Sequence, residues 1–290
     1  GAGTLQLAAS DFGTRFADGF SSITVGSADA GAIAVGGATT FPHSTTLTSN
    51  SSIAIGGAVT ANENLALNGN GAIGQSAALQ VAGTTAIAAG AGNDITLSHA
   101  DNDFTGAVSV ASGNNLAIED KNAMTLGAIN AAGTVDIATL TGNLILTGAI
   151  NTTNTTASAL KFRASKNTAA GSATGGNIVV AGGSVSVGAG GTAKLYSGSV
   201  ADSTGLTALV GAGSGRFRYN ADANTDFSGG GWTALSTGVN AIYRELLTVT
   251  VTASNAAKSY DGNTYSGGNG ASYSGLVNGD TSASLGGTLA

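Results

Sequence analysis

A parallel β-helix, an all-β solenoid of stacked coils, is the fold class that this sequence predicts. Apolar residues recur in pairs two positions apart, and this spacing places both side chains on one face of a short strand. Equivalent pairs return at a regular interval, as from Ile33 to Ile53 and from Leu116 to Val135. A repeat of about 20 residues that holds two or three short strands is typical of stacked β-coils, which bury a continuous apolar column between them.

The predicted strands are short, roughly three to five residues each, and clusters of Gly, Asn, Ser and Thr separate them as turn formers do. A stack of about ten coils, about 4.8 Å apart, gives a rod about 50 Å long. The apolar pairs that define the strands are Leu5/Leu7, Ile23/Val25, Ile33/Val35, Ile53/Ile55, Leu65/Leu67, Ile95/Leu97, Val108/Val110, Leu116/Ile118, Val135/Ile137, Leu144/Leu146, Ile178/Val180 and Val185/Val187.

The composition agrees with this fold and excludes others. Of 290 residues, 47 are glycine and only 9% are charged, with a single proline and no cysteine. Collagen needs abundant proline, and a disulfide scaffold needs cysteine. A hydrophobic content of 42% with so little charge argues against disorder and against a helical protein. We expect aliphatic side chains, rather than aromatic ones, in a narrow interior, and Gly or Asn at corners that need a positive φ.

The charge balance limits the partners. Ten basic residues stand against 16 acidic ones, for a net charge of −6. Nucleic-acid binders and electrostatic membrane anchors need clustered Lys and Arg, so neither is predicted. No run of about 20 apolar residues is present, and membrane insertion is therefore not predicted.

The chain begins at Gly1 without a signal segment, and we expect it to be a piece of a longer protein.

Three regions follow from the pattern along the chain. Residues 1–200 are predicted to form the rod. Residues 201–245 are denser in charged and aromatic side chains, such as Arg216 and Trp232, and are predicted to be an irregular end or junction that caps it. Residues 246–290 begin with alternating residues at 247–252, which predict a half-exposed strand, and continue as a tail rich in Tyr, Gly and Asn.

Gly-Asn pairs recur before the apolar pairs and predict a repeated turn. If these asparagines lie at equivalent corners of successive coils, their amides can form a ladder. The motifs are Gly92-Asn93, Gly113-Asn114-Asn115, Gly142-Asn143 and Gly176-Asn177.

No catalytic, cofactor-binding or metal-binding residue is predicted, and the ligand-binding residues stay unassigned. His43 and His99 are far apart in a chain without cysteine, which disfavours a zinc site. Asp101-Asn102-Asp103 resembles a fragment of a calcium loop but lacks the required Gly and distal Glu. Ser214 lies between glycines in a predicted loop rather than at a strand–helix elbow.

Six carboxylates form the densest acidic set of the rod. About one coil separates Asp101 or Asp103 from Glu119 or Asp120, so these side chains are candidates to align, with Lys121 beside them. Paired carboxylates on one side of a β-helix are the arrangement that polysaccharide cleavage uses. We favour solvated charge that keeps the rod soluble and keep a carbohydrate-active site as the alternative. The set comprises Asp94, Asp101, Asp103, Glu119, Asp120 and Asp136.

The tail carries the most specific motif. Lys258-Ser259-Tyr260-Asp261-Gly262-Asn263-Thr264-Tyr265, followed by residues 273–280, resembles the YDG-type repeat of large bacterial surface proteins of the filamentous-haemagglutinin type. The segment 102–108 and the link from Phe217-Arg218-Tyr219-Asn220 to Tyr243-Arg244 also resemble those proteins.

This resemblance implies a right-handed parallel β-helix that is exported by a two-partner or autotransporter route and displayed on the bacterial surface. Two departures, the lack of an Asn-Pro-Asn secretion motif and a YDG unit that stops at Ala290, suggest an internal slice. The expected function is a non-catalytic stalk of an extracellular adhesin or fibre. Its expected partners are a glycan or protein of a host or neighbouring cell, or further copies of itself, and no cofactor is expected. The alternative is a carbohydrate-binding or carbohydrate-cleaving β-helix protein.

Overall fold

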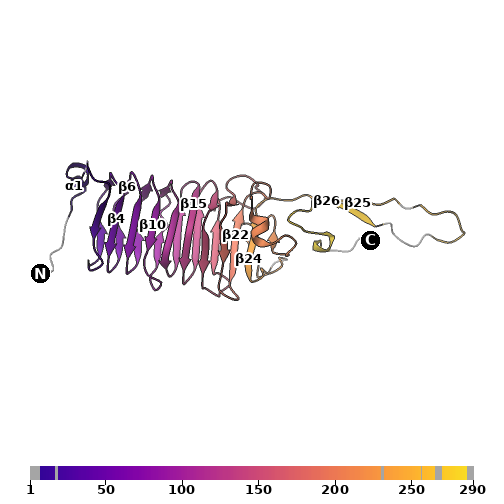
Figure 1. The fold of residues 1–290 in the computed structure, drawn as a ribbon. Helices are drawn as coiled ribbons and strands as arrows, with labels where there is room; N and C mark the ends of the chain where they lie inside the picture. Colours follow the sequence, from indigo (N-terminus) through magenta and orange to yellow (C-terminus); the bar gives the residue numbers. More distant parts are fainter. Residues whose placement is uncertain (1–6, 17–18, 230–231, 256, 265–269, 286–290) are drawn as a thin grey trace.

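The computed structural model describes residues 7–16, 19–229, 232–255, 257–264 and 270–285. These residues form a long rod of stacked strands that continues into a thin tail at the carboxyl end (Figure 1). The helical elements among them are short: α1 (Ala9–Thr14), α2 (Leu206–Val210) and the 3-10 turn η1 (Ser282–Ser284). The predicted all-β parallel β-helix is confirmed.

Three parallel sheets, named here A, B and C, run along the rod. Sheet A contains β1 (Ile23–Gly26), β4 (Thr45–Ser49), β7 (Leu65–Gly69), β10 (Thr85–Ala88), β13 (Val108–Gly113), β15 (Met124–Ala131), β17 (Leu144–Leu146), β18 (Ala149–Thr152), β20 (Ile178–Val180) and β21 (Ser184–Ser186). Sheet B contains β2 (Ile33–Val35), β5 (Ile53–Ile55), β8 (Ile73–Gln75), β11 (Ile95–Leu97), β14 (Leu116–Asp120), β16 (Val135–Thr139), β19 (Leu160–Arg163), β22 (Thr192–Ser197), β24 (Gly238–Tyr243) and β23 (Phe217–Arg218). Sheet C contains β3 (Thr39–Phe41), β6 (Val59–Ala61), β9 (Leu79–Val81) and β12 (Asp103–Phe104).

The register of sheet B places equivalent aliphatic residues above one another. Ile33 pairs with Ile53, and Ile53 pairs with Ile73, so each pairing step is one coil of the predicted repeat. The same column continues through Ile95, Leu116, Val135 and Leu160. From Ile53 onward these side chains are at most 2% exposed, and they form the apolar column that the two-residue pairs predicted.

The interior also holds aromatic side chains, which the sequence analysis did not expect. Phe41, Phe104 and Phe162 are at most 1% exposed. Phe41 and Phe104 lie on the first and last strands of sheet C, at the two ends of that sheet as the structure describes it. Phe12 of α1 packs edge-on against Phe41 with ring centroids 4.9 Å apart, so this helix covers the first strand of sheet C.

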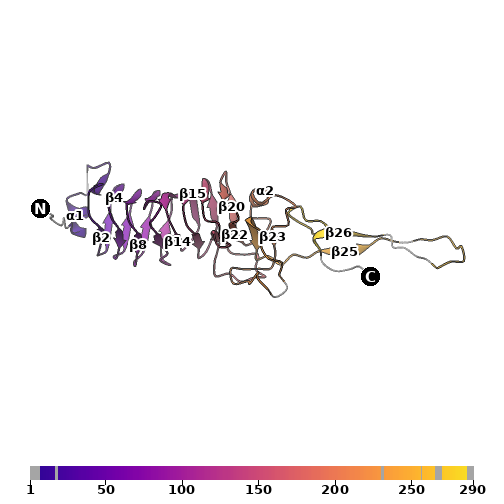
Figure 2. The same cartoon turned by 90° about the horizontal axis from the view of Figure 1, so that it is seen from below.

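The cross-section of the rod changes after sheet C ends at β12. Up to that point each coil crosses sheets A, B and C in turn. After β14 the chain passes directly to β15 of sheet A, and the described rod continues with sheets A and B alone. Figure 2 shows the two continuing sheets along the later part of the rod.

Some corner glycines are required by close approach of the backbone rather than by positive φ, which corrects the expected role of glycine at these corners. A Cβ on Gly57 would lie 2.2 Å from the carbonyl carbon of Gly37, in the preceding coil. A Cβ on Gly106 would lie 2.3 Å from the carbonyl oxygen of Gly83. Such distances are sterically forbidden, so stacked corners of this kind admit only glycine.

The carboxyl end of the rod is built from a long excursion between two paired strands. β22 and β24 pair in parallel along their whole length, and residues 198–237 lie between them. Within this excursion α2 packs against β20 and β24, while β23 pairs with β24 (Figure 2).

The tail contains one antiparallel pair of strands among its described residues, β25 (Thr250–Ala253) and β26 (Ala271–Ser274). The alternating segment 247–252 was expected to form a half-exposed strand, but only its second half does so, and β25 is exposed along its whole length. Within the described chain β25 pairs with β26 alone and covers no apolar layer. Of the YDG-like motif, Tyr265 lies outside the described residues.

Candidate functional site

The structure brings part of the acidic set together at the end of sheet C. Lys121 Nζ lies 2.8 Å from Asp103 Oδ2, and the Asn122 side chain donates to Asp103 Oδ1 at 3.1 Å. The hydrogen bond from Lys121 lowers the pKa of Asp103. Asp120 lies close enough for the charge of Asp103 to act on it. The predicted alignment across one coil therefore holds for Asp103, Asp120 and Lys121.

Asp120 is fully buried, and its carboxylate accepts a backbone hydrogen bond at the edge of sheet C, where a further strand would otherwise supply the acceptor. Its carboxylate accepts a hydrogen bond from the backbone N–H of Phe104 at 2.6 Å and from that of Asn122 at 2.7 Å. Phe104 is on the last described strand of sheet C, so no further strand of that sheet accepts from its N–H. Burial raises the pKa of Asp120 to about 6, with a smaller contribution from the charge of Asp103.

Asn102, in the middle of the calcium-loop-like fragment Asp101-Asn102-Asp103, forms hydrogen bonds to several neighbouring strands. Asn102 is fully buried, and its Oδ1 accepts from the backbone N–H of Leu79 at 2.9 Å and from Gln75 Nε2 at 2.7 Å. Its Nδ2 donates to Gln75 Oε1 and to the carbonyl oxygens of Leu97 and Glu119 at 2.9 to 3.1 Å. An amide bonded in this way has no oxygen lone pair left for a cation. No group of three or more His, Asp or Glu residues able to hold a metal is found in the described part of the chain.

The remaining carboxylates of the set also have partners. Glu119, on β14, pairs with Lys166. Asp94 accepts from the backbone and side chain of Asn115 at 3.1 Å, and the backbone bond is the main cause of its lowered pKa. Asp101 is exposed and lies 3.9 Å from His99 Nδ1. Asp101 lies close enough to Lys121 for its charge to act on that ammonium group, whereas Asp94 and Glu119 are held by other partners.

The Gly-Asn corners form hydrogen bonds between coils, but not as a continuous ladder of stacked amides. Asn143 Oδ1 accepts from the backbone N–H of Asn177 at 2.8 Å, and Asn177 Oδ1 accepts from that of Ser199 at 2.8 Å. Asn114 donates to Asp94 at 2.9 Å. These amides satisfy backbone donors where the chain turns, which is a structural role.

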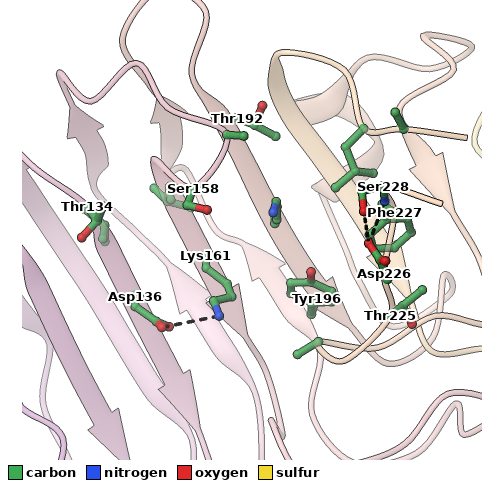
Figure 3. A pocket seen from close by; sticks show the side chains of 17 residues that line it. Thr134, Asp136, Ser158, Lys161, Thr192, Tyr196, Thr225, Asp226, Phe227 and Ser228 are labelled. Atoms are coloured by element: carbon green, nitrogen blue, oxygen red, sulfur yellow. Dashed lines mark hydrogen bonds and ion pairs between the residues drawn. The ribbon is translucent and has the colours of Figure 1, made fainter.

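A groove of about 550 Å³ lies on the outer face of sheet B in the second half of the rod. Its floor comes from β16, β19 and β22, and its wall comes from residues 223–228 and 234–235 of the excursion (Figure 3). The lining residues are Thr134, Val135, Asp136, Ala157, Ser158, Leu160, Lys161, Thr192, Lys194, Tyr196, Ala223, Thr225, Asp226, Phe227, Ser228, Ala234 and Leu235.

Charged side chains form a row across the floor of this groove. Asp136, Lys161 and Lys194 are register partners on three neighbouring strands. Lys161 Nζ lies 3.7 Å from Asp136 Oδ2, while Arg163 Nη2 lies 2.6 Å from Asp136 Oδ1. Figure 3 shows Asp136 and Lys161 joined in this way, with Asp226 and Phe227 on the opposite wall. Burial raises the pKa of Tyr196, beneath the wall, to about 12.

Sequence reasoning selected Asp136 but missed the other members of this groove. The alternation Leu160-Lys161-Phe162-Arg163 does place Lys161 and Arg163 on the outer face. However, Lys161 and its partner Lys194 lie much further apart along the chain than the regular period of the first coils. The wall has no periodic pattern, so its position was visible only in three dimensions.

Beyond the groove, the tail is joined to the end of the rod by polar contacts. The Tyr219 hydroxyl donates to Asp280 Oδ2 at 2.6 Å and accepts from Asn278 Nδ2 at 3.0 Å. Thr207 Oγ1 donates to Asn278 Oδ1 at 2.6 Å, and the Tyr219 ring stacks on Tyr243 with centroids 5.7 Å apart. The segment Asn278-Asp280 is therefore fixed to the rod rather than loosely tethered.

The fold and its repeated coils define the class of this chain as a repeat-built β-solenoid. Residues 42–111 match a family model described as repeats of unknown function (DUF5649), and this stretch covers regular coils from β4 into β13. No curated protein and no solved structure matches the sequence. Within the described residues, no helix is long and apolar enough to cross a membrane.

Proposed function

We propose that this chain is a non-catalytic structural stalk in an extracellular bacterial adhesin or fibre, displayed on the cell surface. The observation that carries the proposal is the unbroken parallel ladder of sheet B, from β2 to β24, above a continuous aliphatic column. Such a stack resists bending because each coil is bonded along its length to the next. The resemblance to filamentous-haemagglutinin-type proteins and the lack of cysteine support export to the surface.

A whole-coil deletion tests the stalk. Removing residues 53–72 joins Ser52 to Ile73, which occupies the position of Ile53 one coil later. We expect the variant to fold, to shorten the rod by about 4.8 Å, and to leave adhesion of the producing bacterium intact. Removing residues 53–62 is the matched control, since half a coil breaks the register and should prevent folding. Loss of adhesion with the folded whole-coil variant would contradict a spacer role.

Surface display is tested separately on intact cells of the producing bacterium. Antibodies against the rod should label these cells without permeabilisation. Labelling only after permeabilisation would overturn the extracellular part of the proposal and leave the stalk itself untouched.

Self-association into a fibre is the second part of this proposal. The exposed strand β25, with Val251 43% exposed, has one backbone edge without a partner strand in the described chain, and this edge can add a strand from another copy. Electron microscopy of a dilution series should show end-joined rods at high concentration. Single rods at every concentration would contradict self-assembly.

The competing function is carbohydrate cleavage at the acidic set. Asp103 and Asp120 do lie close together, which is the observation in its favour. Both carboxylates are engaged in hydrogen bonds, so we expect no release of reducing sugar from bacterial or host polysaccharides. Release that disappears in Asp103→Asn or Asp120→Asn would establish an enzyme and overturn the stalk.

A further inference from the structure

The groove on sheet B carries an excess of positive charge on an acidic chain. Its floor row and the adjoining Arg163 hold three cations, Lys161, Arg163 and Lys194, against the single carboxylate of Asp136. Asp136 is shared between Lys161 and Arg163. With Asp226 of the groove wall counted as a second carboxylate, the local charge is +1, on a chain whose net charge is −6.

Lys194 is the unneutralised member of this row. It lies directly opposite Lys161 on the neighbouring strand, and its ammonium group makes no hydrogen bond or ion pair within the described residues. Like charges at directly opposed strand positions destabilise a sheet. An anion between the two ammonium groups would remove this repulsion, so the pair is arranged as a receptor for a negatively charged group.

The surroundings of the lysine pair narrow the class of ligand. The groove volume of about 550 Å³ is within the usual range for small-molecule sites. Thr134, Ser158, Thr225 and Ser228 supply hydroxyl groups around it. Phe227, held edge-on against Trp232 at 5.5 Å, supplies an apolar wall. Hydroxyls, an aromatic wall and a cation pair together suit a ring that bears both hydroxyl groups and a carboxylate.

We propose that this groove binds an acidic saccharide, with the sugar carboxylate between Lys161 and Lys194 and the ring against Phe227. An acidic peptide fits less well for two reasons. β22 is paired on both sides, with β19 and β24, so the groove floor offers no free strand edge for a peptide. Asp226 on the wall would repel successive carboxylates, whereas it can accept hydrogen bonds from sugar hydroxyls.

Binding to the intact chain can be measured by titration calorimetry with three acidic probes: trigalacturonate, a hyaluronan tetrasaccharide and sialyllactose. Maltotriose serves as the neutral probe and triglutamate as the peptide probe. We expect at least one acidic sugar to bind at least tenfold more tightly than both of these. Failure of all three acidic sugars, or equal binding of triglutamate, would overturn the proposal.

Two substitutions locate the site. Lys194→Gln should weaken binding of the acidic sugar at least tenfold, and Lys194→Arg should keep it within about threefold. The Lys194 ammonium group makes no hydrogen bond or ion pair to the described residues, so an unchanged circular-dichroism melt should show that the variant folds. Lys258→Gln, which removes the same charge from the tail, should leave binding unchanged. Equal binding by the Lys194→Gln variant would place the ligand elsewhere and refute the groove. These outcomes concern the groove alone, because the stalk proposal does not depend on a bound sugar.

Discussion

The first and second halves of the rod share one ladder but differ in regularity. In sheet B the first coils are equal in length, as the steps from Ile33 to Ile53 to Ile73 show. The later steps lengthen, first from Val135 to Leu160 and then further from Leu160 to Ala193. The next step, from Ala193 to Val239, is longer still and contains the excursion that supplies the groove wall. The lesson is that a solenoid tolerates insertions at its corners without losing its core, and chemistry collects at the insertions.

The two halves of the rod also differ in one outward-facing column of residues on sheet B. In the first half it holds small residues, and in the second half it holds charged ones. Small side chains there offer a ligand only backbone, methyl groups and the hydroxyl of Thr96, while the charged ones form the groove floor. From β2 to β22 the column consists of Ala34, Ala54, Gly74, Thr96, Ala117, Asp136, Lys161 and Lys194.

The largest expected effect tests whether the two halves share one cooperative core. Phe104→Ala and Phe162→Ala each remove a fully buried ring, one from each half. Each should lower the free energy of unfolding by about 3–5 kcal/mol. Because coils contact mainly their neighbours, amide-exchange protection should fall most around the altered coil. Equal loss of protection along the whole rod would show that the two halves form a single cooperative unit.

A second prediction concerns Asp120, at the boundary between the halves. Its pKa in the folded protein, about 6, exceeds the ordinary value of 3.8, so the folded state binds this proton more tightly than the unfolded state. The stabilisation is complete below pH 4 and is lost as the pH rises through 6. Relative to Asp120→Asn, the wild type should lose up to about 3 kcal/mol across this interval.

Chemical denaturation of both proteins at several pH values measures this difference. Asp94→Asn is the control, since hydrogen bonding lowers the pKa of Asp94 and its contribution is lost as the pH falls. The two substitutions should therefore change stability with opposite pH slopes. A carboxyl resonance of Asp120 that titrates near pH 4 would contradict the raised pKa.

Much of the rod could be predicted because its pattern is local. Alternation over three residues assigns the inward positions of each strand, and the regular period stacks them. Contacts that depend on the period, such as Asp103 with Lys121, could be anticipated for the same reason. Contacts that depend on a break in the period could not. In the sequence Asp120 is interpreted as a loop charge. In the structure sheet C ends beside Phe104, and Asp120 is the acceptor for the backbone N–H of Phe104.

The candidate site shows the same limit. Lys161 and Lys194 are ordinary outward residues in the sequence, and only the strand pairing sets them opposite each other. Phe227 belongs to a stretch without periodicity, so nothing local indicates which face it covers. Sequence reasoning thus finds the scaffold, whereas the groove arises from the loop lengths between its strands.

A smaller effect is expected at the far end of the second half, where the rod meets the tail. Tyr219→Phe removes a hydroxyl that bonds both Asp280 and Asn278 but keeps the ring on Tyr243. The loss should destabilise docking of residues 276–281 by about 1.5 kcal/mol, since one of the bonds is to a carboxylate. Amides of this segment should then exchange about tenfold faster, while those of the rod stay unchanged. Tyr260→Phe, at a side chain that is 98% exposed, is the matched control and should alter neither. Faster exchange in the rod itself would mean that the tail stabilises the last coils. The contact between Tyr219 and the segment Asn278-Asp280 would then be part of the structure that caps the rod.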